Sequence, residues 1–188
     1  EVNKKKNIVA ALLTSPTYEG VVSDIQLIAK TLHEYNIPVI VDEAHGAHLT
    51  YIEKTTEKHV DLTNTYDMEF PALNFGADIV VQSLHKTLPS LTQTALCHLK
   101  SKLIDEKCLE ESLHIFETSS PSYVFMAGID ACIRYMSKSY AYVSQYLKSL
   151  KGFREKVSSC KSIHLWEENT GLGYDFTKLV IYSDNIDG

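Results

Sequence analysis

Three short apolar runs, each ended by polar residues, constrain the fold of this chain more than any other feature. The runs cover residues 8–14, 37–42 and 78–83, and residues 94–99 offer a fourth. Short runs of near-continuous hydrophobicity are typical of parallel strands whose two faces are both covered. A helical pattern separates the first two runs, as in a strand–helix–strand unit. The chain is therefore predicted to fold as an α/β protein around a buried, mainly parallel sheet.

Helical periodicity accounts for much of the remaining sequence. Residues 23–26 have the Ser-x-x-Gln form of a capping box, and apolar residues then recur at helical spacing, which predicts a helix over residues 23–35. Further helices are predicted over residues 121–136 and 139–157, and residues 103–113 carry one more helical face.

Two other stretches have a different texture. Residues 50–74 are polar and irregular, which predicts an excursion over the surface with a short helix begun at Pro71. From Ile163 onward short strand patterns alternate with glycine turns. Asp187-Gly188 is a turn signal that another element normally follows, so we expect the sequence to end within a larger architecture.

Composition excludes several classes of protein. The chain has 18 basic and 24 acidic residues, a net charge of −6, which disfavours nucleic-acid binding through the overall field. The apolar runs are far shorter than the roughly 20 residues of a membrane span. Four cysteines without C-x-x-C spacing predict reduced thiols and a cytoplasmic protein. The sequence starts without methionine or a secretory signal, so we expect a piece of a longer protein.

Polar clusters follow three of the predicted strands, at residues 14–20, 42–48 and 83–89. In open α/β sheets, ligands bind outside the carboxyl ends of the parallel strands. These clusters are therefore the first candidates for a functional site.

The second cluster allows two interpretations that remain open from the residues alone. Asp42-Glu43-Ala44-His45 matches the magnesium box of DEAH-box helicases, but that site also needs a phosphate loop, which this sequence lacks. Asp42, His45 and His48 could instead ligate a metal, although no further ligand clusters with them. Otherwise His48 is expected to be structural.

The third cluster favours a different chemistry. Lys86 follows a buried strand directly, behind Ser83 and His85, and a lysine in such surroundings suits covalent attachment to a carbonyl compound. Asp42 ends another strand and could pair with the protonated ring nitrogen of a pyridoxal group. Together Lys86 and Asp42 predict pyridoxal 5'-phosphate (PLP) as the cofactor.

Five segments carry a resemblance to a known family. Residues 14–20, 39–48, 76–89, 118–123 and 175–179 resemble the Orn/Lys/Arg decarboxylases, in the form typical of Gram-positive bacteria. The resemblance implies an α/β, three-layer PLP-dependent transferase-like large domain of fold type I, the aspartate-aminotransferase-like class. Its mixed sheet would be mainly parallel, and the domain truncated at both ends. The resemblance further implies that residues 1–157 are the C-terminal part of this large domain and that residues 158–188 begin a truncated C-terminal small domain.

The resemblance also implies a function. This is decarboxylation of a basic amino acid, arginine, lysine or ornithine, to the corresponding amine, as in polyamine biosynthesis. Another fold type I PLP enzyme, an aminotransferase or an α-oxoamine synthase, is the alternative within the same fold. A non-catalytic relative is a further alternative, which the intact Lys86 disfavours.

The resemblance assigns roles to residues that match the family motifs. Lys86 would hold the cofactor covalently, Asp42 would pair with its ring nitrogen, and Ala44 would pack on a face of the ring. Ser83 and His85 would reach the cofactor phosphate. Lys86, Asp42 and His85 form the expected catalytic set.

The remaining site residues come from the other matched segments. His45 would lie near the phenolic oxygen of the cofactor. Ser119 and Ser120 would reach the phosphate bound in a neighbouring subunit, which makes a homodimer or higher homo-oligomer a requirement for function. Ser15 and Thr17 are candidates for contact with the substrate, or they only shape the turn around a proline.

The family pattern includes parts that this sequence lacks. The phosphate-binding loop and the aromatic residue that stacks on the cofactor ring are expected before Glu1, and most of the small domain is expected after the last residue. We therefore expect the 188-residue chain alone to bind PLP weakly and to have no useful turnover.

Overall fold

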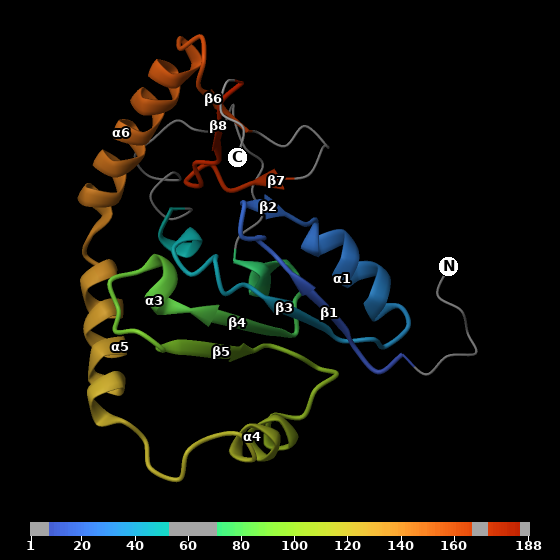
Figure 1. The fold of residues 1–188 in the computed structure, drawn as a ribbon. Coiled ribbons are helices and arrows are strands. Elements are labelled where there is room, and N and C mark those ends of the chain that lie inside the picture. Colours follow the sequence, from blue (N-terminus) through green and yellow to red (C-terminus); the bar gives the residue numbers. More distant parts are fainter. Residues whose placement is uncertain (1–7, 53–70, 167–172, 185–188) are drawn as a thin grey trace.

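The computed structural model describes residues 8–52, 71–166 and 173–184 and contains one central sheet (Figure 1). Its strands, in the order β1-β3-β4-β5, are β1 (Ala11–Thr14), β3 (Val39–Asp42), β4 (Ile79–Ser83) and β5 (Ala95–Leu99). β3 pairs in parallel with both β1 and β4, whereas β5 pairs antiparallel with β4. The predicted α/β fold with a mainly parallel mixed sheet is confirmed.

The predicted helices are present, with boundaries shifted by a few residues. They are α1 (Ile25–His33), the short 3₁₀ helix η1 (Ala72–Phe75), α4 (Glu106–His114), α5 (Tyr123–Met136) and α6 (Tyr140–Ser158). The sequence does not predict one further short helix, α3 (Leu84–Thr87), which follows β4 directly. Pro71 caps η1, as predicted. Residues 49–52 are also helical, at the start of the predicted irregular excursion, and residues 53–70 of that excursion lie outside the described chain.

The predicted capping box of the first helix is wrong in its details. Asp24 is the N-cap of α1, and its carboxylate accepts a hydrogen bond from the Leu27 amide at 2.8 Å. The Ser23 amide instead donates to the hydroxyl of Ser15 at 3.0 Å. The Ser23 amide is therefore bonded to Ser15 rather than to a side chain of the helix, and the neighbouring Asp24 caps the helix.

Two apolar clusters pack on the sheet. α1 and η1 meet the strands through one cluster, Ile25, Ala29, Val39, Val41, Ala72, Ala77 and Val80. α3 and α5 meet in a second cluster, which contains Ala47, Leu84, Leu88, Cys132 and Met136. Figure 1 shows α5 and α6 in succession along one side of the molecule, with α1 on the other side of the sheet. The sheet is thus held between helices, and its strand ends are left for loops.

The first predicted strand is less buried than expected. β1 is an edge strand of the central sheet, and its residues alternate between half-buried and exposed, with Leu12 74% exposed. The expectation of a buried strand is therefore wrong for β1 within the described residues, because only the face that carries Leu13 packs on the apolar core.

The C-terminal residues form short strands, as their sequence predicts. β6 (His164–Leu165) pairs with β8 (Ile181–Tyr182), and β7 (Gly173–Tyr174) pairs antiparallel with β2 (Val21–Val22). The predicted glycine turn lies mostly in residues 167–172, outside the described chain. The boundary between residues 157 and 158 stays a prediction. Within the described ranges, no helix is long and apolar enough to cross a membrane.

Candidate active site

Three loops meet at the carboxyl ends of the parallel strands, as the sequence predicts. We call residues 14–20 the first loop, 42–48 the second loop and 83–89 the third loop. The pairing of β1, β3 and β4 sets their starting points side by side. The Ser15 amide donates to the Asp42 carbonyl at 3.0 Å, and the Glu43 amide donates to the Val81 carbonyl at 2.9 Å. The sheet hydrogen bonding therefore continues into the loops and fixes their relative positions.

Lys86 and His45 are in direct contact. Lys86 lies in α3, immediately after β4, and its Nζ is 3.3 Å from His45 Nε2. Burial, together with the positive charges of Lys86 and Lys178, lowers the pKa of His45, against the opposite effect of Asp42 and Glu19. A neutral imidazole can accept a hydrogen bond from the Lys86 ammonium through Nε2. Tyr18 packs edge-on against the same ring, with centroids 5.1 Å apart.

Asp42 ends β3 with one oxygen available. Its Oδ1 accepts a hydrogen bond from the Ala44 amide at 3.0 Å, which holds the carboxylate in a tight turn. Among the described residues, no donor is bonded to the other oxygen. The side chain is half-buried rather than enclosed. A ligand with a positively charged N–H group would therefore find an oriented, unsatisfied carboxylate here.

His85 and Ser83 flank the lysine in the third loop. His85 Nδ1 lies 3.0 Å from the Thr94 carbonyl, so Nδ1 is the donor and carries the proton. This leaves Nε2 without a proton in the neutral ring. Ser83 precedes α3, and its hydroxyl makes no capping bond to that helix. Both side chains keep polar atoms for a ligand, and their contact with a cofactor phosphate stays a prediction.

Ser15 and Thr17 have clear local roles. Ser15 is buried and its Oγ accepts the Ser23 amide, while Thr17 Oγ1 accepts the Val21 amide at 3.1 Å. These bonds fix the first loop, which agrees with the turn-forming interpretation. Substrate contact by either residue stays a prediction.

Ser119 and Ser120 lie apart from this cluster in the single chain. They belong to the exposed segment between α4 and α5, and the carbonyl of Ser120 accepts the Thr118 hydroxyl at 3.1 Å. Within the described residues, neither serine is hydrogen-bonded to the three loops. Their expected role toward a neighbouring subunit stays a prediction.

Glu43 supports the second loop from the core side. It is fully buried, and it accepts hydrogen bonds from the Ala72 amide at 3.1 Å and from the Gln82 amide group. Burial raises the pKa of Glu43 to about 7, although both hydrogen bonds act to lower it. A Cβ on Gly46 would lie 2.5 Å from Glu43 Cγ, so only glycine fits there. Glu43 therefore holds the loop in place and points away from Lys86.

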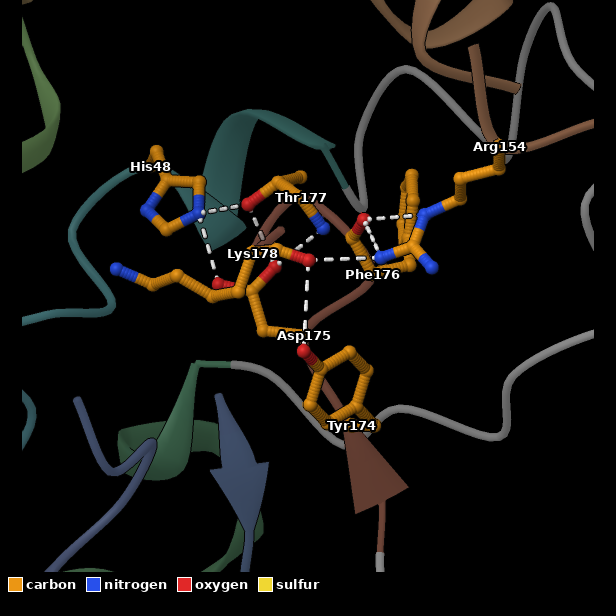
Figure 2. Close-up of polar contacts among 7 residues, drawn as sticks. All are labelled: His48, Arg154, Tyr174, Asp175, Phe176, Thr177 and Lys178. Atoms are coloured by element: carbon orange, nitrogen blue, oxygen red, sulfur yellow. Dashed lines mark hydrogen bonds and ion pairs between the residues drawn. The ribbon is translucent and has the colours of Figure 1, made fainter. Parts of the chain in front are cut away.

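A second support of the second loop comes from residues near the C-terminus. The sequence does not predict it. His48 Nε2 is 3.1 Å from Asp175 Oδ2 and 2.9 Å from Thr177 Oγ1 (Figure 2). Thr177 donates its hydroxyl proton to Asp175 Oδ1, so it accepts from His48 Nε2–H. Burial acts to raise the pKa of Asp175, but the bonds from His48 and Thr177 hold it below its usual value. His48 is thus structural, as expected.

This contact also bears on the metal interpretation of the second loop. His48 is directed to Asp175 and Thr177 rather than to a site shared with Asp42 and His45. Over residues 8–52, 71–166 and 173–184, no group of three or more histidine, cysteine or acidic side chains is arranged to hold a metal ion. The geometry of the second loop therefore does not support the proposed metal site.

Comparisons with known proteins agree with one another. The family model described as "Orn/Lys/Arg decarboxylase, major domain" matches residues 1–179. The uncharacterized protein YaaO of Bacillus subtilis is 36% identical over 161 residues, which are 81% of this chain and 30% of YaaO. An arginine decarboxylase of Bacillus cereus is 28% identical over 176 residues, which are 90% of this chain and 35% of that enzyme.

A solved structure shares the fold. The lysine decarboxylase LdcF of Francisella novicida superimposes with a TM-score of 0.58 at 19% identity, over 86% of this chain and 22% of LdcF. The chain therefore spans about a third or less of the length of these relatives.

Proposed function

The chain belongs to the Orn/Lys/Arg decarboxylase family, and from this premise we propose that it carries the catalytic lysine of a PLP-dependent decarboxylase of a basic amino acid. The substrate would be arginine, lysine or ornithine, and the product the corresponding amine. One observation carries the proposal: Lys86, in contact with His45, and the under-bonded carboxylate of Asp42 follow neighbouring parallel strands.

The described residues offer chemical groups that fit PLP. Lys86 offers an exposed primary amine for the aldehyde, and Asp42 offers a free carboxylate oxygen for a protonated ring nitrogen. Ala44 lies between Asp42 and His45 and adds only a methyl group, which leaves room beside a flat ring. Ser83 and His85 keep polar atoms available next to Lys86. When bound, PLP supplies an electron sink for the electrons released as the carbon–carbon bond breaks.

The protein residues have separate tasks in this scheme. Lys86 would hold the cofactor covalently through its amine. His45 orients the lysine, because its neutral ring can accept a hydrogen bond from the Lys86 ammonium. Asp42 would pair with the protonated ring nitrogen through its free oxygen. His85 is held by the Thr94 carbonyl, so its free nitrogen keeps a fixed position.

Several finer assignments belong to the same proposal. We place the protein in the aspartate-aminotransferase-like, fold type I class and in the Gram-positive branch of the family, as a cytoplasmic enzyme of polyamine biosynthesis. Ser119 and Ser120 would complete the phosphate site of a second subunit in a homodimer or higher homo-oligomer. Their exposed position and lack of bonds to the three loops of the same chain support this. The 188-residue chain alone is expected to bind PLP weakly and to be inactive.

The test is a decarboxylation assay on the full-length gene product. Purified protein with added PLP is incubated separately with arginine, lysine and ornithine, and CO₂ release and amine formation are measured. We expect release from at least one of them, and none above background with Lys86→Ala. If no basic amino acid yields CO₂, or if Lys86→Ala retains the activity, the proposed function is wrong.

A further inference from the structure

A turn near the C-terminus lies against the candidate site although it is far away in the sequence. We call residues 174–178 the distal turn. Its Asp175 amide donates to the Gly20 carbonyl at 2.7 Å, next to the pairing of β7 with β2. The Lys178 amide in turn donates to the Asp175 carbonyl at 3.0 Å. The distal turn is therefore joined to the first loop through main-chain bonds.

The distal turn is also held by side chains from two other directions. Arg154 of α6 donates to the Phe176 carbonyl at 2.7 and 3.0 Å and to the Lys178 carbonyl at 2.7 Å (Figure 2). On the other side, the buried Asp175 carboxylate accepts from His48 of the second loop. Charge-assisted bonds of this kind are stronger than neutral ones. The main chain at Lys178 is therefore fixed relative to the second loop.

The contact with Gly20 sets the path of the Lys178 side chain. Gly20 has a φ of +112°, and a Cβ at this position would lie 2.9 Å from Lys178 Cγ and 3.1 Å from Lys178 Cβ. The aliphatic stem of Lys178 thus lies directly on the first loop. Figure 2 shows the Lys178 side chain extended, with no dashed line at its ammonium.

The part of the chain that the structure describes offers no counter-ion to the ammonium of Lys178. Among the described residues, no carboxylate forms a salt bridge with it, although the side chain is half-buried. After burial and Lys86, the positive charge of Lys178 is a further cause that lowers the pKa of His45, the residue that contacts Lys86. An ammonium without a counter-ion can form a charge-assisted hydrogen bond to an anionic group that enters the site. The position is therefore suited to an anionic group of a ligand.

The chemistry of the substrate identifies this group. An amino acid presents an amine, a side chain and an α-carboxylate, and in the proposed function the amine displaces Lys86. We infer that Lys178 binds the α-carboxylate of the amino-acid substrate, an inference that rests on the proposed function. The carboxylate leaves as neutral CO₂, so this ion pair exists with the substrate and is lost with the product. Lys178 therefore favours substrate over product at the same site.

The inference predicts a separation between substrate and product binding. In the full-length protein with PLP, Lys86→Ala blocks turnover, so calorimetry can measure binding of both the amino acid and its amine. Adding Lys178→Met, which keeps the stem and removes the charge, should raise the Kd of the amino acid about 10- to 100-fold, the value of a charged hydrogen bond. The Kd of the amine should change less than about twofold. Lys178→Arg should restore much of the amino-acid affinity.

Turnover gives a second readout. In the otherwise wild-type protein, Lys178→Met should raise KM by a similar factor and should not lower kcat, because the ion pair is made with the bound substrate and weakens as the carboxylate becomes neutral CO₂. Lys151→Met, an exposed lysine of α6, is the matched control and should change neither constant.

Other results would overturn the inference. Equal weakening of amino acid and amine would indicate a structural role for Lys178. Weaker binding of PLP, with an unchanged ratio of amino-acid to amine affinity, would place the cofactor phosphate beside Lys178 instead. Unchanged binding of all three ligands would show that Lys178 has no such role. A wild-type protein without decarboxylase activity would refute the proposed function itself, which the Lys178 variants alone cannot do.

Discussion

The aspartates at the two ends of the parallel strands differ in burial and in the number of hydrogen bonds that they accept. At the amino end of β4, Asp78 is buried and accepts hydrogen bonds from His33 Nε2 and the Val39 amide, both at 2.8 Å, and from the Ser101 hydroxyl. At the carboxyl end of β3, Asp42 is half-buried and accepts one, from the Ala44 amide. The first carboxylate is saturated by the protein and stabilises the fold. The second keeps an oxygen for a ligand.

Lysines at the two ends differ in the same way. Lys86 contacts His45 at the carboxyl ends. Lys100 follows β5 at the opposite end of the sheet, where its side chain is exposed and its amide donates to the Asp78 carbonyl. The comparison indicates that stability and chemistry are concentrated at opposite ends of one sheet. This is the arrangement expected when ligands bind beyond the carboxyl ends of parallel strands.

The largest effect is expected when each of the two lysines is removed in turn by mutation. Lys86→Ala in the full-length protein should lower kcat/KM by about a thousandfold or more, because the covalent attachment to the cofactor is lost. Lys100→Ala should leave kcat/KM within about twofold. Both variants should keep the wild-type melting temperature. Comparable losses of activity in the two variants would remove the distinction between the two ends.

The aspartates should show the reverse effect on stability. Asp78→Ala leaves the Val39 amide and the Ser101 hydroxyl without their acceptor and should lower the free energy of unfolding by about 3 kcal/mol. Asp42→Ala should change it by less than about 1 kcal/mol but abolish tight PLP binding. Urea titration and cofactor absorbance measure the two properties. An Asp42→Ala variant as unstable as Asp78→Ala would contradict the proposed division.

The buried Glu43 beneath the second loop should make stability depend on pH. Its pKa rises from 4.5 to about 7 on folding, so the folded state binds the extra proton between these values. Stability is therefore highest below pH 4.5 with respect to this group and falls as pH rises through 7, by roughly 3 kcal/mol in total. Glu43→Gln should flatten the dependence between pH 5 and 8, as followed by thermal unfolding.

An unchanged pH dependence in Glu43→Gln would show that another group controls stability in this range. Asp105→Asn is a suitable control, because Asp105 caps α4, away from the second loop, and should leave the dependence as in the wild type.

The smallest effect is expected for Ser15 of the first loop, where a variant can distinguish turn formation from substrate contact. Ser15→Ala removes the acceptor of the Ser23 amide and should lower the free energy of unfolding by about 1 kcal/mol. If Ser15 serves only the turn, KM for the amino acid should stay within about twofold. A KM change that exceeds the loss of stability would instead support substrate contact by Ser15, the interpretation that the local hydrogen bonds disfavour.

Much of the fold and of the site follows from local sequence patterns. Apolar runs predict the strands, and the carboxyl-end rule then brings Asp42 and Lys86 to the same edge without any structure. The direction of β5 could not be predicted, because a four- or five-residue apolar run has no polarity of its own. The cap of α1 was missed because Ser23 and Asp24 are equally good caps, and a distant contact with Ser15 decides between them.

The support from the distal turn could not be predicted for a related reason. His48 and Asp175 are 127 residues apart in the sequence, and nothing near either residue indicates the other. The same holds for Lys178, whose position depends on Gly20 and Arg154. Local patterns locate residues that act at strand ends, whereas a contact between distant turns is fixed only once the whole chain has packed.

The central claim is that Lys86 is the residue that binds PLP. The most direct test treats the full-length protein with PLP and borohydride, which makes the attachment permanent, and maps the modified peptide by mass spectrometry. We expect a pyridoxyl group on the peptide that contains Lys86, and no adduct at this position in Lys86→Ala. An adduct confined to another lysine, or none at all in the wild type with PLP present, would contradict the account.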